Sequence, residues 1–441
     1  MGRQATDADF NASSQYITMQ IEIYFDGPTA QPFLISINDY LIDVEWLEGL
    51  SETTNPFGAV SSNELSFTLS NEDGLFTPTN NTSPFYGKIK RGIKVIPYLR
   101  PNVMGEDIDW LKLGEFYVTS WDAVVTGITA NIVANDAWHL IFNSPAPDYP
   151  IEHDVSFYDA LTNIYIAMGF EVQVDTSLEE LLLYSFIEGE PLDFTQEILT
   201  GAMSYCTSNK DGVPVVSAFL KNRPLRGTLL DSNQIVNATA SQPINRVFDG
   251  VELTYTVPQG MAQEQLVDLR DLHAPAGTFQ VENLGISRGP LWKVISVLVQ
   301  SREVRLENYT ATPWYITLNL RNSGDPATVG LVIHGQTVGF TEFLLPDEGI
   351  KPLKVKNRYI QNEEYAQKYK SVLEALVQDS IPMLALEIVS NPLLAIGDRV
   401  LVQSDRYKLN YNGLIMQMKY KYRGGLSCEM TLLNANLLQG V

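Results

Sequence analysis

The sequence contains little of the chemistry that metal sites and redox sites need. Its 441 residues include only two cysteines, Cys206 and Cys428, which lie far apart and each within an apolar pattern. The four histidines are widely separated, and none stands at metal-ligand spacing from another ligand or in an HExxH frame. We therefore expect two buried thiols, no disulfide and no metal site.

The chain also lacks the common motifs of membrane proteins, nucleotide-binding proteins and hydrolases. No apolar run approaches the roughly 18 residues of a membrane-spanning helix. The N-terminus has no secretory pattern, and the GxSxG, GxxxxGK[ST] and GxGxxG motifs are all missing. The sequence thus predicts no catalytic residues, no cofactor and no membrane partner.

Positive charge is scarce over most of the chain, whose formal net charge is −22. Residues 351–441 hold 12 Lys and Arg against 8 Asp and Glu, so the other residues hold 18 against 44. Such an acidic surface repels phosphates, which argues against a nucleic-acid-binding protein. It suits solubility, or a wall past which a polyanion slides without binding.

What the sequence does contain is many short alternating runs rich in Val, Ile, Thr, Tyr and Phe, which favour β structure. The length predicts three or four domains. We expect a mainly β fold with α+β parts: two small tube-type β-barrels, an α/β middle domain and an inserted β-sandwich. The boundaries are 1–145 for the N-terminal barrel, 146–240 for the α/β domain, 241–260 plus 353–441 for a helix-flanked C-terminal barrel, and 261–352 for the insertion.

The clearest pattern is a long strand that begins near Gly413. Four large side chains alternate with polar and basic ones, namely Met416, Met418, Tyr420 and Tyr422 against Gln417, Lys419, Lys421 and Arg423. Gly424-Gly425 then predicts a tight turn and a return strand. The basic row of Lys419, Lys421 and Arg423 is a candidate subunit interface that would meet an acidic surface on a neighbouring subunit. A solvated strand face is the alternative.

Helical periodicity appears in two places. Between the two predicted barrels, Ser156 can cap a helix that stops at Gly169, and a second helix is expected from about Asp193 to Tyr205. Near the C-terminus, Asn362 can cap an amphipathic helix whose buried stripe is Tyr365, Tyr369, Val372, Leu373 and Leu376. Phe248 to Thr256 is expected to be a barrel strand with partners after Pro352.

Two interpretations from other functional classes stay open. The chain could be a β-rich carbohydrate-binding adhesin with Trp292, Trp314 and Tyr315 as stacking platforms, although core packing also explains these aromatics. It could also be a polysaccharide hydrolase, which needs two carboxylates across a groove. Pairs such as Asp107 and Asp109 or Glu179 and Glu180 are expected by chance in so acidic a chain, so we predict that it is not an enzyme.

Two stretches of the sequence carry a family resemblance. The first runs from Asn63 to Leu69 and on through Asn71 to Phe76, Ser83 to Gly87 and Arg91 to Val95. The second comprises the C-terminal helix, Asn391 to Val400 and the closing Gly424-Gly425-Leu426 hairpin. Together they resemble the tail hub proteins of tailed bacteriophages, the baseplate hub or tail-tip group. The order of barrel, α/β domain and barrel fits as well, whereas the insertion at 261–352 matches least.

The resemblance implies a structural virion protein, made in the host cytoplasm, that forms a homotrimer whose six barrels make a pseudo-hexameric ring. Such a ring adapts the tail tube to a spike or fibre and lets DNA pass. The implied partners are a tail tube or distal tail protein on one side and a spike, fibre or tip protein on the other, with the tape measure protein as a further candidate.

Overall fold

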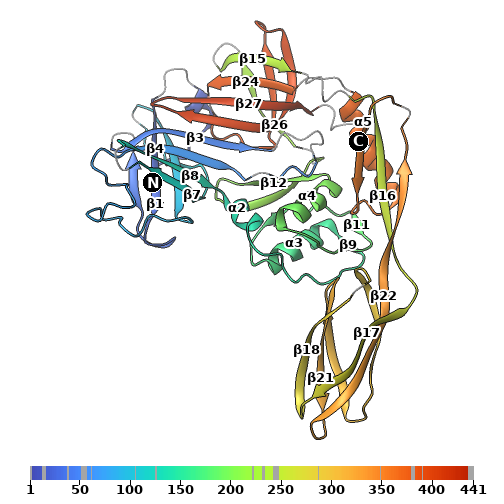
Figure 1. The fold of residues 1–441 in the computed structure, drawn as a ribbon. Helices are drawn as coiled ribbons and strands as arrows, with labels where there is room; N and C mark the ends of the chain where they lie inside the picture. The colour runs from blue at the N-terminus through green and yellow to red at the C-terminus, as the bar shows by residue number, and fades with distance from the viewer. Residues whose placement is uncertain are drawn as a thin grey trace.

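The computed structural model describes residues 2–11, 16–36, 39–50, 57–60, 62–104, 106–124, 127–220, 223–230, 234–241, 248–286, 288–347, 349–378, 383–389 and 391–435. Strands dominate these residues, so the mainly β class predicted from the alternating runs is confirmed. Figure 1 shows a strand-rich body, a helical middle part beside it, and a long lobe that projects away from both.

The N-terminal strands lie side by side in one sheet. They are β1 (Tyr16–Tyr24), β2 (Phe33–Ser36), β3 (Leu41–Gly49), β4 (Glu64–Ser70), β5 (Lys94–Asn102), β6 (Leu111–Lys112), β7 (Phe116–Ala123) and β8 (Thr129–Asn135). Helix α1 (Asp7–Asn11) precedes them and α2 (Ala137–Phe142) follows. The predicted alternation holds in β4, where Leu65, Phe67 and Leu69 are buried. The order β3-β4-β8-β7-β5-β1-β2 makes β3 one end of this set.

The C-terminal strands continue the same sheet. They are β14 (Leu225–Leu230), β15 (Ile235–Ser241), β24 (Met383–Val389), β25 (Arg399–Ser404), β26 (Leu409–Tyr422) and β27 (Leu426–Asn434). The first half of β26 pairs with β25, and the second half pairs with β3. The β26–β3 pairing joins the two strand sets into one 14-stranded sheet. The two barrels expected as separate units therefore share one sheet. An alternating sequence fixes which side chains are buried, but not which strand takes the free edge.

The middle part packs helices on short strands. Its elements are β9 (Val155–Ser156), α3 (Phe157–Ala167), β10 (Gln173–Val174), β11 (Leu181–Leu182), α4 (Pro191–Gly201), β12 (Ser204–Ser208) and β13 (Pro214–Ala218). The predicted cap is confirmed, since Ser156 accepts from the Asp159 N–H at 3.0 Å. Helix α4 ends before Tyr205, because Met203 turns the chain with a left-handed φ of 47° and β12 begins at Ser204.

Two strands at the end of the expected α/β domain belong elsewhere. β14 pairs in parallel with β25, and β15 pairs antiparallel with β24, so both extend the large sheet. The strand set of the C-terminal half thus begins at Leu225 rather than after residue 240. The expected boundary at 240–241 falls on the edge of the described residues, because 242–247 lie outside them.

The lobe consists of two sheets. Its strands are β16 (Gly250–Gly260), β17 (Glu264–Ala274), β18 (Gly277–Gly285), β19 (Leu291–Val299), β20 (Val304–Ala311), β21 (Tyr315–Asn322), β22 (Ala327–Leu345) and β23 (Pro352–Asn357). Strands β17 to β22 enclose a small apolar core of their own, whereas the buried residues of β16 and β23 belong to the main core. One sheet contains β17, β22, β16, β23 and β19, and the other β18, β21 and β20. The 19-residue β22 and the β16–β17 run connect the lobe to the rest of the molecule (Figure 1).

The strand predicted at Phe248 to Thr256 has the expected partner after Pro352, since β16 pairs in parallel with β23. Both strands, however, belong to the lobe's five-stranded sheet and not to the sheet of β24 to β27. The sequences of β16 and β23 do not show which of the two sheets they join, because the residues of β22 that pair with β16 lie 78 to 92 positions later in the chain.

The C-terminal helix α5 (Glu363–Gln378) follows its prediction at the N-terminus, where the Asn362 side chain accepts from the Tyr365 N–H at 2.7 Å. Tyr365, Tyr369, Val372 and Leu373 are buried, and Leu376 packs at the edge of the core. The helix lies against β16 and against the end of α4. The Tyr365 hydroxyl donates to Gly201 O of α4, and the Tyr369 hydroxyl donates to Thr200 O of the same helix. None of the described helices has the length and apolarity to cross a membrane.

Candidate functional site

The seam between β3 and β26 joins the N-terminal and C-terminal strand sets. The ladder runs from Gln417 opposite Gly49 to Tyr422 opposite Val44. Trp46 and Tyr420 are directly opposite each other, both fully buried, with their rings stacked 4.3 Å apart. The other three residues of the predicted apolar face, Met416, Met418 and Tyr422, are buried as well, which confirms that face of the strand.

The seam is where the structure places the predicted interface residues. Lys419 pairs with Glu45 at 3.1 Å, Lys421 with Glu429 at 2.6 Å and Arg423 with Asp43 at 3.6 Å. The hydrogen bond to Glu429 raises the pKa of Lys421. The basic row therefore meets acidic side chains of its own chain, on β3 and β27. Contact of this row with another subunit stays a prediction.

The middle part is attached to the seam by one buried carboxylate. Lys210, in the turn between β12 and β13, places its Nζ 2.6 Å from Oε1 of Glu48, whose side chain is 8 % exposed. Glu48 lies on β3 opposite Met418. A buried carboxylate without a cation is costly, so this pair fixes the position of the β12–β13 turn on the seam.

A second attachment surrounds Asp136, which caps α2. Its Oδ1 accepts from the Trp138 N–H at 3.1 Å and from the Ser62 hydroxyl at 2.8 Å. The Trp138 indole donates to Thr207 O at 2.7 Å, which connects α2 to β12. Burial raises the pKa of Asp136 to about 6.

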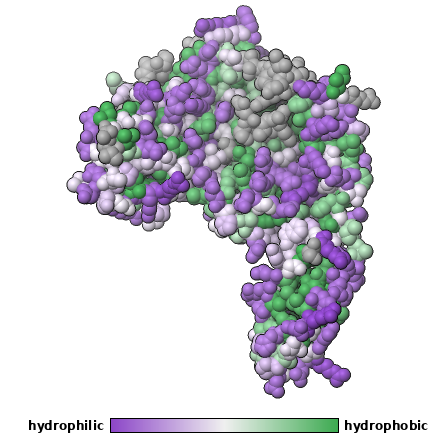
Figure 2. Space-filling model, viewed as in Figure 1, coloured by the Kyte–Doolittle hydropathy of each residue, from purple (hydrophilic) through white to green (hydrophobic). Residues whose placement is uncertain are grey.

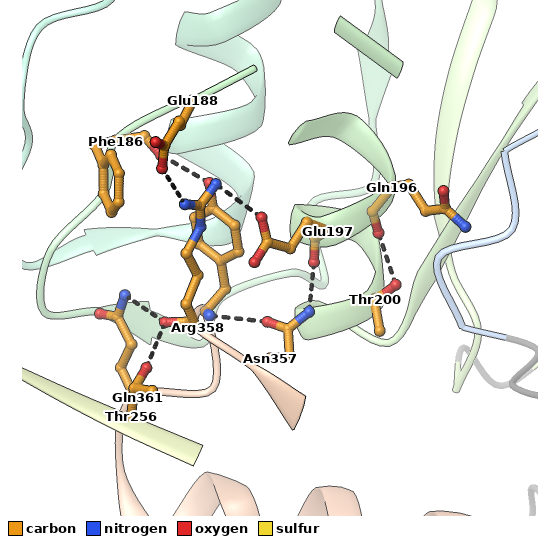
Figure 3. Close-up of polar contacts among 10 residues, drawn as sticks. Phe186, Glu188, Gln196, Glu197, Thr200, Thr256, Asn357, Arg358 and Gln361 are labelled. Atoms are coloured by element: carbon orange, nitrogen blue, oxygen red, sulfur yellow. Dashed lines mark hydrogen bonds and ion pairs between the residues drawn. The ribbon is translucent and has the colours of Figure 1, made fainter. Parts of the chain in front are cut away.

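The third attachment is centred on Arg358, just after β23, and joins the lobe strands to the middle part (Figure 3). Its guanidinium donates to Glu188 at 2.9 Å and contacts Glu197 of α4 at 2.7 Å. It also lies over the Phe186 ring at 4.6 Å. Burial raises the pKa of Glu197, and the charge of Arg358 opposes that shift. One planar cation thus holds two carboxylates from different segments.

Neighbouring amides complete this junction. Asn357 donates to Glu197 O at 2.8 Å, and Gln361 exchanges two hydrogen bonds with the backbone of Tyr184 at 2.7 and 2.9 Å (Figure 3 shows Asn357 and Gln361). The Tyr359 hydroxyl donates to Phe186 O at 2.7 Å. Two side-chain amides and one hydroxyl therefore satisfy buried backbone groups across the junction, which favours a single orientation of the parts.

The same junction accounts for one of the aromatic residues considered as sugar platforms. The Trp292 ring stacks on Tyr184 at 5.4 Å and meets His153 edge-on at 4.6 Å. Trp314 is half-buried and Tyr315 is 48 % exposed. The faces of Trp292 are thus used in holding the lobe to the middle part, so the three aromatics do not form one open platform.

The carboxylate pairs noted in the sequence lie apart from these attachments. Asp109 accepts from the Gly2 N–H at 3.0 Å, and the Asp107 carbonyl accepts from the Arg3 N–H at 3.0 Å. Glu179 and Glu180 line a groove described below. In the part of the chain that the structure describes, no group of three His, Cys, Asp or Glu side chains is placed to hold a metal ion.

Sequence reasoning missed Arg358 and Asp136. Arg358 is one cation in a chain with many carboxylates, and its partners lie 170 and 161 positions away, so no local pattern indicates it. Asp136 is one carboxylate among many, and the Ser62 hydroxyl that bonds it comes from before β4, 74 positions earlier in the chain.

The apolar and polar surfaces are mixed on the viewed face of the body, while apolar side chains gather on the upper part of the lobe (Figure 2). The exposed apolar residues of the lobe strands include Ile295 and Leu298 of β19 and Phe343 and Leu344 of β22. Scattered apolar residues are normal on a surface, but a gathered set on a projecting part is typical of contact surfaces.

No protein-family model matches this sequence, and no curated protein is similar to it in sequence. Solved structures do match. The 43 kDa tail protein of prophage MuSo2 from Shewanella oneidensis has a TM-score of 0.54 and 12 % identity, covering 96 % of this chain and 100 % of that one. The tail protein from Neisseria meningitidis MC58 has a TM-score of 0.53 and 11 % identity, covering 96 % and 98 %. Because the likeness spans nearly the whole of each chain, this protein has the fold of phage tail proteins.

Proposed function

We propose that this chain is a structural component of a bacteriophage tail, the hub of its baseplate or tail tip, and not an enzyme. The observation that carries the proposal is the whole-length likeness to two tail proteins, with the lobe included in the matched length. A likeness confined to one sheet would support only a common building block, because one fold can host many functions.

In this proposal three copies assemble into a ring with six similar positions. Each chain contributes an N-terminal unit of β1 to β8 and a C-terminal unit of β14, β15 and β24 to β27, joined edge to edge through β3 and β26. Two units per chain and three chains give the pseudo-hexamer that continues a six-fold tail tube. The shared sheet supports this arrangement because it fixes the angle between the two units within each chain.

The remaining features fit a channel and its two ends. A net charge of −22 suits a wall that DNA slides past, since like charges prevent binding to phosphates. A tube or distal tail protein would bind one end of the ring and a spike, fibre or tip protein the other. The attachments at Glu48, Asp136 and Arg358 would keep the middle part and lobe in fixed positions on the ring.

Light scattering of the purified chain, combined with negative-stain images of the same peak, tests this proposal. We expect three times the monomer mass and rings with a central hole. Concentration should be varied widely, because a weak trimer dissociates on dilution. A particle that stays monomeric at the highest concentration, with or without a candidate tube protein, contradicts the ring.

A further inference from the structure

A groove of about 850 Å³ lies between the middle part and the first two turns of α5. We call it the α5 groove. Its lining comes from the start of α3, the segment around β11, the end of α4, the end of β13 and α5, and comprises Phe157, Ser177, Leu178, Glu179, Glu180, Leu181, Leu183, Ala202, Met203, Ala218, Leu220, Asn362, Glu364, Tyr365 and Lys368. None of the attachments described above uses these side chains as ion-pair partners.

The floor of the groove is apolar and held in place. Phe157, Leu178, Met203 and Tyr365 are buried, and Leu181 is 52 % exposed at the mouth. Tyr365 donates to Gly201 O at 2.7 Å. The backbone at 178–180 is fixed by the N–H groups of residues 157 and 158, which donate to the carbonyls of residues 180 and 178 at 3.0 and 2.9 Å. The groove is therefore preformed, which lowers the entropy cost of binding.

The rim of the groove is acidic. Glu179, Glu180 and Glu364 stand on it, against one cation, Lys368. Within the described residues none of these three carboxylates has an ion-pair partner within 4 Å, whereas Glu45, Glu48, Glu188 and Glu197 elsewhere all have one. The rim thus keeps negative charge available beside an apolar floor.

We propose that the α5 groove is a docking site for a cationic, amphipathic segment of a partner protein. Apolar side chains of that segment would occupy the floor, and Lys or Arg side chains would reach the three rim carboxylates. The charge pattern selects this occupant over an acidic or purely polar segment. The inference concerns a surface of a single chain, so it stands whether or not the chain forms a trimeric ring.

The test measures binding of three short fluorescent peptides to the full chain by anisotropy. One peptide contains Leu and Lys, one Leu and Glu, and one Ser and Lys. We expect only the Leu and Lys peptide to bind in a saturable way, with Leu181→Ser weakening it. Equal binding of the Ser and Lys peptide would mean attraction to the acidic surface at large, and would overturn the proposal. So would failure of the Leu and Lys peptide to bind.

A matched pair of variants locates the site. The triple change Glu179→Lys, Glu180→Lys and Glu364→Lys should weaken binding by about tenfold or more, since each tenfold is about 1.4 kcal/mol and several charge contacts are lost. The control Glu72→Lys, Glu171→Lys and Glu190→Lys alters the net charge equally at exposed positions outside the groove. Equal weakening by both variants overturns the proposal. If the triple variant melts early, Leu181→Ser alone decides, because that side chain is 52 % exposed and we expect its removal to leave the fold intact.

Discussion

The rings of Trp46 and Tyr420 stack 4.3 Å apart with 9° between their planes, although 374 positions separate them in the chain. They are opposite each other in the β3–β26 ladder, at the point where the N-terminal strand set meets the C-terminal one. Because both rings are fully buried, the seam has an apolar interior and not only a row of backbone hydrogen bonds. The two halves of the chain therefore fold onto one another as parts of one core.

Truncating either ring should weaken the whole protein. Tyr420→Ala removes a fully buried aromatic side chain, for which we expect a loss of about 3–5 kcal/mol in the free energy of unfolding. Tyr420→Phe should lose about 1 kcal/mol or less, because the hydroxyl's partner is the soft acceptor Met418 Sδ at 3.2 Å. Urea unfolding followed by fluorescence measures both, and similar losses in the two variants would contradict a stabilising role for the ring stack.

Arg358 should be harder to replace than an ordinary surface arginine. Its partners are partly exposed, so we expect Arg358→Met to cost about 1.5–3 kcal/mol of stability rather than the full value of a buried pair. Hydrogen exchange should also increase at 184–188, which its contacts hold. Arg358→Lys should fail to restore stability, because one ammonium does not bridge two carboxylates as a guanidinium does.

Arg288→Met is the control for that experiment. Arg288 pairs with Glu264 at 2.7 Å but its side chain is 68 % exposed, so its loss should be close to zero. If Arg288→Met and Arg358→Met lower the urea midpoint equally, the junction around Arg358 is not a specific attachment.

The basic row offers a test of where its partners lie. Lys419→Glu should lower the stability of the monomer by about 1 kcal/mol or less, because it replaces an ion pair with two part-exposed carboxylates that lie close together at Glu45. Adding Glu45→Lys should restore stability by reversing the pair within the chain. If the double variant regains stability and assembles as before, the functional partner of Lys419 is Glu45 of its own chain. Loss of assembly without loss of stability in the triple reversal of Lys419, Lys421 and Arg423 favours the subunit interface instead.

Local patterns predicted the local structure well. The buried face of β26, the cap at Asn362 and the stop at Gly169 all depend on residues within a few positions of one another, and each is confirmed. The insertion at 261–352 stays a prediction as a domain, although the short strands β17 to β22 do enclose a separate core.

Pairings between distant segments were not predictable from those patterns. The free edge of β3 could be filled by any strand with an apolar face, and nothing in residues 41–49 selects β26. The same holds for β16, which was assigned to the C-terminal barrel and belongs to the lobe sheet. For the site, the sequence predicted that the row at Lys419 meets an acidic surface on a neighbouring subunit, which stays a prediction. It did not indicate the ion pairs that the row forms with β3 and β27 of its own chain.

Asp136 should make stability fall as pH rises through the mildly acidic range. Burial raises its pKa from 3.8 to about 6, so between these values the folded state holds a proton that the unfolded state has lost. Stability then falls with rising pH by up to about 1.4 kcal/mol per unit, and levels off above about pH 6. Asp136→Asn keeps the cap on Trp138 and removes this slope. Urea midpoints of both proteins between pH 4 and pH 7 measure it, and parallel curves would contradict the assignment.

Gly397 and Gly87 should differ sharply when each is changed to alanine. Both have left-handed φ, 81° and 73°, so both changes share a backbone cost of about 1–2 kcal/mol. A Cβ at Gly87 meets nothing within 4 Å, whereas at Gly397 it would overlap the ends of the Arg223 and Tyr205 side chains. Arg223 could swing aside only by giving up its bond to Gly397 O at 2.7 Å, and the Tyr205 ring is 1 % exposed.

We therefore expect Gly397→Ala to lose at least about 1 kcal/mol more than Gly87→Ala, within the usual range for overpacking. Thermal and urea unfolding of the two variants give the comparison directly. Equal losses would mean that the Gly397 turn relaxes freely, and that the chain between β24 and β25 is not tightly held by the middle part through Arg223.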